Sequence, residues 1–291
     1  FKKIMKISEK VYVSTGGLKN IDAIKAVKKF SSGDISEIEL SGGKFSKNIE
    51  KKVIKLSKKH NLRIHNYFPP PKKPFVINLA SSNKYILNKS INHAKKAINL
   101  ATKIKSKYYS FHAGFLIDPS PKLLGKEFKE IKITNRKTAL KIFKNSVILL
   151  SKIAQKKNVK IFIENNVITK KNKKIFNTNP LLLTNPREIS NFFKKVPKNV
   201  KLLLDVAHLK VSSKTEKFSL FNSFKVLNKF TEGYHLSDNN GLVDNNKSFS
   251  SKSWFFKYLK KNLEYYTIEV YNKSVSDLKK QKKIVENFLT K

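Results

Sequence analysis

Acidic side chains and histidines follow short apolar runs at several places in the sequence. The clearest example is KLLLDVAHLKVSS at 201–213, where three leucines precede Asp205 and His208 follows three residues later. A continuous apolar run is typical of a strand buried in a parallel sheet, and a carboxylate at its end needs a partner to offset desolvation. A divalent metal ion is one such partner, because carboxylate and imidazole are common ligands. Alternatively, Asp205 caps a loop and His208 is an ordinary loop histidine.

The same arrangement recurs along the chain. The residues are His65 in LRIHNYF, His112 in YYSFHAGF, Glu164 in VKIFIENN, His235 in GYHLSDNNG and Glu269 in YYTIEVYN. Each alone also fits a structural role, such as a histidine bonded to a carbonyl or an acid paired with a lysine. Chance would have to place all of them at the same end of their strands, so we predict one shared site. The other two histidines, His60 and His93, are expected on helix surfaces.

These residues belong to a pattern in which strand-like and helix-like segments alternate eight times. The predicted strands are Val11–Thr15, Ile35–Leu40, Leu62–Asn66, Tyr108–His112, Val159–Glu164, Val200–Asp205, Gly233–Leu236 and Tyr265–Val270. The predicted helices between and after them include Ile21–Phe30, Lys84–Ile104, Arg136–Lys156 and Ser274–Leu289. Repeated strand–helix units favour parallel pairing with right-handed crossovers.

We therefore predict an α/β fold, a (β/α)8 TIM barrel forming a single domain over residues 1–291. An open doubly wound sheet is the alternative, but neither Gly16-Gly17 nor Gly42-Gly43 supplies its glycine-rich phosphate turn. In a barrel the carboxyl ends of the strands converge on one mouth, which would bring the acids and histidines together.

Composition restricts the classes of protein that fit. Absence of cysteine excludes disulfides and thiolate metal sites. No apolar run is long enough to span a membrane and FKKIMKISEK does not resemble a signal peptide, so we expect a cytoplasmic protein. The net charge of +42 comes almost entirely from lysines scattered over all helices, which favours a solvated surface. An anionic substrate or nucleic acid stays open as a partner.

Several motifs, in their order and spacing, resemble the xylose-isomerase-like TIM-barrel superfamily, which contains sugar isomerases and epimerases and the endonuclease IV branch. The motifs are IELSGG at 38–43, FVINLAS at 75–81, SFHAG at 110–114, IENN at 163–166, LLLDVAHLKVS at 202–212, YHLSDNNG at 234–241 and TIEVYN at 267–272. The resemblance extends from the second strand to the last helix and is specific for the superfamily rather than for a substrate.

The epimerase members imply a metal ion held by the residues matching Glu164, Asp205, His235 and Glu269. The two glutamates would also move protons on opposite faces of a sugar or sugar phosphate, and His208 would steady a substrate oxygen. Mn²⁺, Mg²⁺ or Co²⁺ suits such mixed ligation. The expected reaction is isomerisation or epimerisation through an enediolate.

The endonuclease branch implies a different reaction, hydrolysis of DNA at abasic sites with zinc. There, His65 and His112 would hold an additional zinc with Glu164. A third zinc would use His208 with an Asp-x-His pair, but here that pair reads Asp244-Asn245-Asn246. Because asparagine is a poor zinc ligand, we rank this interpretation second. A non-catalytic sugar-binding barrel ranks third, since the acid pair Glu164 and Glu269 is intact.

Substrate contacts are expected from residues just beyond the strand ends. Asn166 and Asp238 could bond sugar hydroxyls, although Asn166 could equally form a turn. Trp254 and Phe115 could stack on a sugar face or pack on the barrel. Glu39 could bond substrate or pair with a lysine. Assembly as a homodimer also stays open.

Overall fold

The computed structural model describes residues 7–18, 21–121 and 132–291. Within them, a closed barrel of parallel strands runs in chain order from β1 to β8, and β8 pairs with β1. The strands are β1 Val11–Ser14, β2 Glu37–Ser41, β3 Asn61–His65, β4 Tyr108–His112, β5 Lys160–Glu164, β6 Val200–Asp205, β7 Thr231–Leu236 and β8 Tyr265–Ile268. The predicted (β/α)8 barrel is confirmed.

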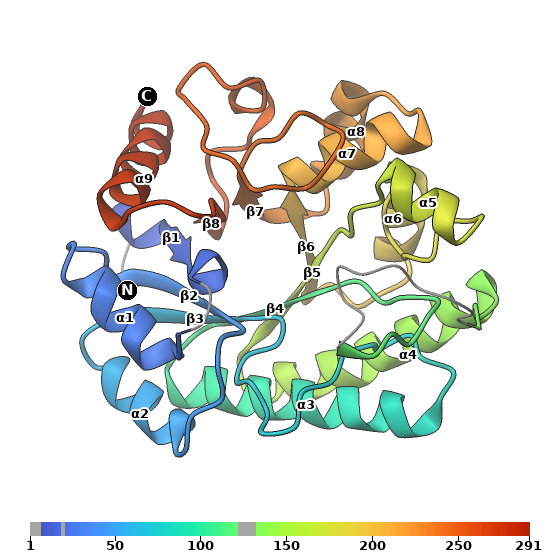
Figure 1. Ribbon diagram of the computed structural model, residues 1–291, viewed down its shortest axis with the longest axis horizontal. Helices are drawn as coiled ribbons and strands as arrows, with labels where there is room; N and C mark the ends of the chain where they lie inside the picture. The colour runs from blue at the N-terminus through green and yellow to red at the C-terminus, as the bar shows by residue number, and fades with distance from the viewer. Residues whose placement is uncertain (1–6, 19–20, 122–131) are drawn as a thin grey trace.

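The helices follow one another around the barrel in chain order (Figure 1). They are α1 Ala23–Ser31, α2 Ile49–Leu56, α3 Lys84–Lys103, α4 Arg136–Gln155, α5 Lys170–Ile175, α6 Pro186–Phe193, α7 Val206–Glu216, α8 Leu220–Leu227 and α9 Val275–Thr290. Asparagine begins several of them: the side chains of Asn83, Asn135 and Asn185 accept hydrogen bonds from the first backbone amides of α3, α4 and α6. Such capping satisfies donors that have no partner within the helix.

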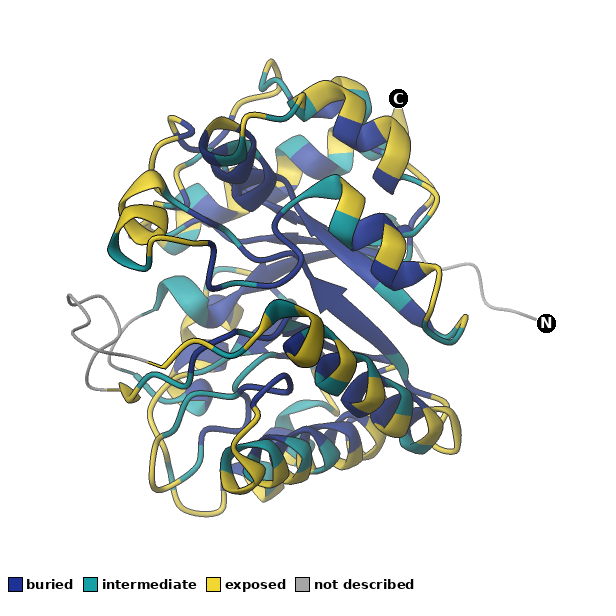
Figure 2. Ribbon diagram, turned by 90° about the vertical axis from the view of Figure 1, so that its right-hand side faces the viewer, coloured by how far each residue is buried: buried dark blue, intermediate teal, exposed yellow. Residues whose placement is uncertain are grey.

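The strands are buried on both faces, and the helices expose only their outer surfaces (Figure 2). This explains why the strands have continuous apolar runs in the sequence. One core cluster lies between the strands and the helices. A smaller one comprises Tyr12, Tyr108, Phe162, Leu203 and Tyr265.

The small cluster and the polar residues near the strand ends point to the same face of the strands but lie at different levels along them. Phe162 precedes Glu164 by two residues and Leu203 precedes Asp205 by two, so each pair points to the same face of its strand. Apolar side chains therefore fill one level of the barrel, and carboxylates occupy the next level toward the carboxyl ends of the strands.

Arg63 lies among the tyrosines of the small cluster. Its guanidinium carbon is 4.0 Å from the ring centres of Tyr12 and Tyr265 and 4.2 Å from that of Tyr108. Stacking on aromatic faces stabilises a buried guanidinium. The burial of Arg63 was not predicted from the sequence.

No helix in the described part of the chain is both long enough and apolar enough to cross a membrane.

Candidate metal centre

Glu164, at the end of β5, lies at the centre of the polar residues predicted to form a site. It is fully buried. Its Oε2 lies 3.3 Å from His65 Nε2 and 3.4 Å from His235 Nδ1, and its Oε1 lies 3.2 Å from His208 Nδ1. His112 Nδ1 lies 3.7 Å from Oε1. The barrel thus brings histidines from four separate segments to one carboxylate.

Three groups of residues in the described part of the chain have the geometry of a metal site. In the first, one ligand atom from each of Glu164, Asp205, His235 and Glu269 lies within 4.8 Å of the others, and all four residues are buried. The second comprises His65, His112 and Glu164 at the same spacing. These two groups were expected from the family resemblance, and the structure places their members together. The third group, Glu39, His65 and His235, was not predicted.

The residues of the first group fit a divalent cation. Both carboxylate oxygens of Glu164 and Oδ2 of Asp205 are buried and accept no hydrogen bond in the described part of the chain. Buried carboxylate oxygens are costly unless a cation or a donor offsets their desolvation. Carboxylate oxygens combined with imidazole nitrogen suit Mn²⁺, Co²⁺ or Zn²⁺, and Mg²⁺ when oxygen ligands dominate.

The pKa values of His235 and Glu164 also indicate that this group suits a cation. Burial opposes the charge of His235, but the carboxylates of Glu39, Glu164 and Glu269 raise its pKa well above its usual value. Burial also opposes ionisation of Glu164, yet the charges of His112 and His235 hold its pKa well below the usual range. Protonated histidine therefore supplies the positive charge that these acids need, and a bound metal ion would take over that role and release the proton.

The pKa of Asp205 is shifted in the opposite direction from that of Glu164. Burial, opposed by the charge of His208 and supported by the nearby acids, raises the pKa of Asp205 to about 7. Its Oδ1 caps α7 by accepting a hydrogen bond from the backbone amide of His208 at 2.7 Å. The alternative expected Asp205 to cap a loop; it caps a helix that contains His208 instead, and Oδ2 still belongs to the cluster.

His208 lies in the first turn of α7 and is held from both sides of its ring. Nδ1 lies 2.8 Å from the carbonyl oxygen of Asn165, and Nε2 lies 3.1 Å from Asp244 Oδ2. Asp244 comes from the connection after β7 and so reaches the centre, as the endonuclease resemblance implied. Asn246 is buried two residues later.

Two further residues contact the centre, although the sequence did not place them among the metal-site residues. Glu39 Oε1 lies 3.0 Å from His235 Nε2. The hydroxyl of Tyr271 donates a hydrogen bond to Glu269 Oε1 at 3.0 Å. The alternation along β2, which puts Glu39 on the face opposite to Ile38 and Leu40, was the available signal for Glu39.

Three of the residues expected to contact substrate are engaged within the protein. The side-chain amide of Asn166 donates to the carbonyls of Ala113, Gly114 and Leu182. Asp238 Oδ1 accepts from Lys210 Nζ at 2.6 Å and from Trp254 Nε1 at 3.1 Å. These contacts join the strand-end connections to one another, and substrate binding by Asn166, Asp238 and Trp254 stays a prediction.

Phe115, the fourth residue expected to contact substrate, lines a hollow. The hollow has a volume of about 350 Å³ and is also lined by His112, Asn66, Tyr67 and Phe75. This hollow is mainly apolar and reaches a histidine of the second metal-type group. Substrate contact by Phe115 stays a prediction.

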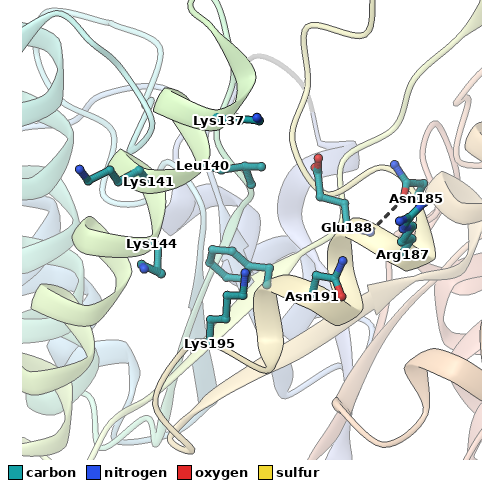
Figure 3. A pocket seen from close by; sticks show the side chains of 10 residues that line it. Lys137, Leu140, Lys141, Lys144, Asn185, Arg187, Glu188, Asn191 and Lys195 are labelled. Atoms are coloured by element: carbon teal, nitrogen blue, oxygen red, sulfur yellow. Dashed lines mark hydrogen bonds between the residues drawn. The ribbon is translucent and has the colours of Figure 1, made fainter.

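A separate hollow of about 510 Å³ lies outside the barrel between α4 and α6 (Figure 3). Lys137, Lys141 and Lys144 line it from α4, and Arg187 and Lys195 face them from the α6 side. Its acid, Glu188, is paired with Arg136 at 2.6 Å. None of the predicted site residues contributes to this basic hollow.

The two histidines expected on helix surfaces are less exposed than predicted. His93 is on α3 as expected but only 6% exposed, because it stacks on Tyr67 and packs against Phe75. His60 follows the end of α2 and is half-buried. The surface prediction was wrong for His93 because an aromatic connection after β3 covers that face of α3.

The fold and the centre define a class of protein: a parallel eight-stranded barrel with a carboxylate–histidine cluster at the carboxyl ends of its strands. Residues 31–271 match the family model of the xylose isomerase-like TIM barrel. The chain therefore belongs to the xylose isomerase-like TIM barrel family, which confirms the resemblance inferred from its motifs.

Solved structures agree with this assignment. A D-tagatose 3-epimerase-like protein is 18% identical with a TM-score of 0.71, over 97% of both chains. D-Psicose 3-epimerase from Clostridium cellulolyticum H10, solved with D-tagatose, is 13% identical with a TM-score of 0.64, over 97% of both chains. A family 2 AP endonuclease from Brucella melitensis is 12% identical with a TM-score of 0.63, over 92% of this chain and 96% of the other. No curated protein sequence matches the chain. At these identities the similarity establishes the fold.

Proposed function

We propose that this protein is a divalent-metal-dependent isomerase or epimerase of a sugar or sugar phosphate. The observation that carries the proposal is the buried group Glu164, Asp205, His235 and Glu269, whose ligand atoms lie within 4.8 Å of one another. The solved structures of similar fold include proteins described as sugar 3-epimerases, which supports this choice of reaction.

The residues have complementary roles in this proposal. A divalent cation held by the four residues would stabilise negative charge that develops on a substrate carbonyl and its neighbouring hydroxyl. Glu164 and Glu269 come from β5 and from the end of β8, so they approach the centre from different sides of the barrel. For epimerisation, one carboxylate would take the proton beside the carbonyl and keep it, while the other, carrying a proton of its own, would deliver that proton to the opposite face. For isomerisation, the carboxylate that took the proton would return it to the neighbouring carbon. His208 lies 3.2 Å from Glu164, and its Nε2 would donate to a substrate oxygen in place of Asp244.

Deuterium exchange tests this reaction on many candidate sugars in parallel. The metal-loaded protein is incubated with a panel of ketoses, aldoses and their phosphates in D₂O, and NMR detects deuterium at the carbon next to the carbonyl. We expect exchange with at least one sugar. Glu164→Gln and Glu269→Gln should each lower it by at least about a hundredfold, the usual scale for loss of a general base.

Matched measurements separate loss of chemistry from loss of fold. Glu232→Gln changes a glutamate near the start of β7 that lies 3.8 Å from Lys201, and it should leave exchange unchanged. Metal content of protein purified without chelators should fall in Glu164→Gln. If both glutamine variants kept near-wild-type exchange on a confirmed substrate, the two-carboxylate mechanism would be wrong.

A second candidate is metal-dependent hydrolysis of a phosphodiester at abasic sites in DNA. The group His65, His112 and Glu164 favours it, because a second metal beside the first would suit attack on a phosphate. Asn246 weighs against a third zinc. Chelator-sensitive cutting of an abasic-site duplex, combined with two or three zinc ions per chain, would replace the first proposal by this one.

A further inference from the structure

We propose that Glu39 is a positioning residue that acts through His235, holding the Nε2 proton of the imidazole so that Nδ1 is presented to the metal ion. This inference rests on the proposed function only in that His235 is taken as a metal ligand. It assigns a role to a buried carboxylate of β2 that does not belong to the four-residue group.

The orientation of His235 is the first support. Nδ1 faces the metal-type group, 3.1 Å from Glu269 Oε2 and 3.4 Å from Glu164 Oε2. Nε2 faces the opposite way, 3.0 Å from Glu39 Oε1. An imidazole that uses Nδ1 as a metal ligand carries its proton on Nε2, which is the nitrogen that lies next to Glu39.

The isolation of this contact is the second support. Both residues are fully buried, and neither Glu39 Oε1 nor His235 Nε2 has a hydrogen-bond partner in the described segments, so their 3.0 Å contact is an ion pair by distance. Two buried polar atoms at this distance are each other's only means of offsetting desolvation. Replacing either partner would leave the other without compensation.

The anchoring of Glu39 is the third support. Its other oxygen, Oε2, accepts a hydrogen bond from Thr267 Oγ1 of β8 at 3.1 Å. β2 and β8 both pair with β1, so the contact crosses the barrel interior. The carboxylate is therefore fixed by one oxygen and faces His235 with the other.

The other histidines of the centre have different partners. His65 Nδ1 lies 2.9 Å from the hydroxyl of Ser110, which is neutral. His208 does contact a carboxylate, because its Nε2 lies 3.1 Å from Asp244 Oδ2, but His208 does not belong to the four-residue group. A carboxylate makes an imidazole a more basic ligand as well as fixing its tautomer, so Glu39 is expected to strengthen His235 as a ligand.

The test is the dissociation constant for Mn²⁺, measured by calorimetric titration of chelator-treated protein. Glu39→Gln keeps the size of the side chain but removes its charge, and it should weaken Mn²⁺ binding by about 10- to 100-fold with one equivalent still bound. Thr267→Val, which only loosens Glu39, should weaken binding less. Ser110→Ala removes the neutral partner of His65 and should leave the dissociation constant unchanged.

The thermal midpoint of the metal-free protein distinguishes this role from a structural one. A lower midpoint in Glu39→Gln with an unchanged dissociation constant would overturn the proposal. Loss of one of two metal equivalents would also overturn it, because Glu39 would then be a ligand in a group with His65 and His235. If the wild-type protein bound no metal at all, the proposed function itself would fail. Weaker binding in Glu39→Gln with an intact wild-type site would support the inference.

Discussion

Individual side chains of the centre have partners both within it and outside it, and the proposed catalytic acid Glu269 has one of each. Its Oε2 lies 3.1 Å from His235, and its Oε1 accepts from Tyr271. Burial and the adjacent carboxylate raise the pKa of the Tyr271 hydroxyl far above its usual value, so the phenol stays a donor throughout the working pH range. Gly16 gives this hydroxyl its space, because a Cβ there would lie 2.9 Å from it.

Tyr271→Phe therefore removes one hydrogen bond from the proposed proton-transfer group. A hydrogen bond to a charged group contributes about 1.5–3 kcal/mol, so the exchange rate on a confirmed substrate should fall about tenfold or more. Metal affinity should change little, because Tyr271 bonds Oε1 of Glu269, whereas Oε2 is the oxygen that lies next to His235. Tyr258→Phe, on a ring packed against Phe221 and Phe224, is the matched control. Equal rates in both variants would show that Tyr271 does not position Glu269.

At the scale of elements, the connections after the strands are joined to helices by buried polar and aromatic contacts. His93 of α3 stacks on Tyr67 at a ring distance of 5.4 Å. Burial, helped by the charge of Lys96, lowers the pKa of His93 to about 4. The folded protein thus keeps this imidazole neutral where the unfolded chain would protonate it.

Acid should therefore destabilise the protein partly through His93. Below pH 6.5 the unfolded chain takes up a proton that the folded chain does not, so stability is lost as the pH falls from 6.5 toward about 4. One such proton contributes about 3 kcal/mol at most over this range. His93→Phe keeps the aromatic contacts and should flatten the dependence of the unfolding free energy on pH. Parallel curves for the two proteins, measured by denaturant titration, would contradict this assignment.

At the scale of the whole molecule, charge is the dominant property. Lysine and arginine number 62 and acids 20, giving +42. Several of the acids are used in the centre and in ion pairs such as Arg136 with Glu188. The surface is therefore largely unbalanced, and the basic hollow between α4 and α6 is one concentrated part of it (Figure 3).

Self-repulsion of this surface should make the fold more stable in salt. Raising KCl from about 0.02 M to about 0.3 M shortens the screening length several-fold, so the thermal midpoint of the metal-free protein should rise. Potassium sulfate at equal ionic strength should raise it further if anions also bind the basic hollow. A midpoint that falls with KCl would mean that attractive ion pairs outweigh repulsion.

Much of the fold was predictable from sequence because strand and helix periodicity is local. All eight strands lie within two residues of their predicted bounds, from Val11–Ser14 to Tyr265–Ile268. The exposed face of α3 was predicted wrongly at His93, since the cover comes from a connection that periodicity does not describe. Assembly as a homodimer and binding of substrate by Phe115 and Trp254 stay predictions.

The sequence by itself determined the barrel, the family and the set of acids and histidines at the strand ends, because apolar runs, their length and the residues that end them are properties of consecutive positions. Tertiary structure alone decided which of these side chains meet. Closure of the barrel brings Glu164 of β5 within reach of His65, His208 and His235. It also pairs His235 with Glu39, from strands far apart in the sequence. Such pairings depend on strand order, register and pleat together, and no single stretch of sequence carries all three.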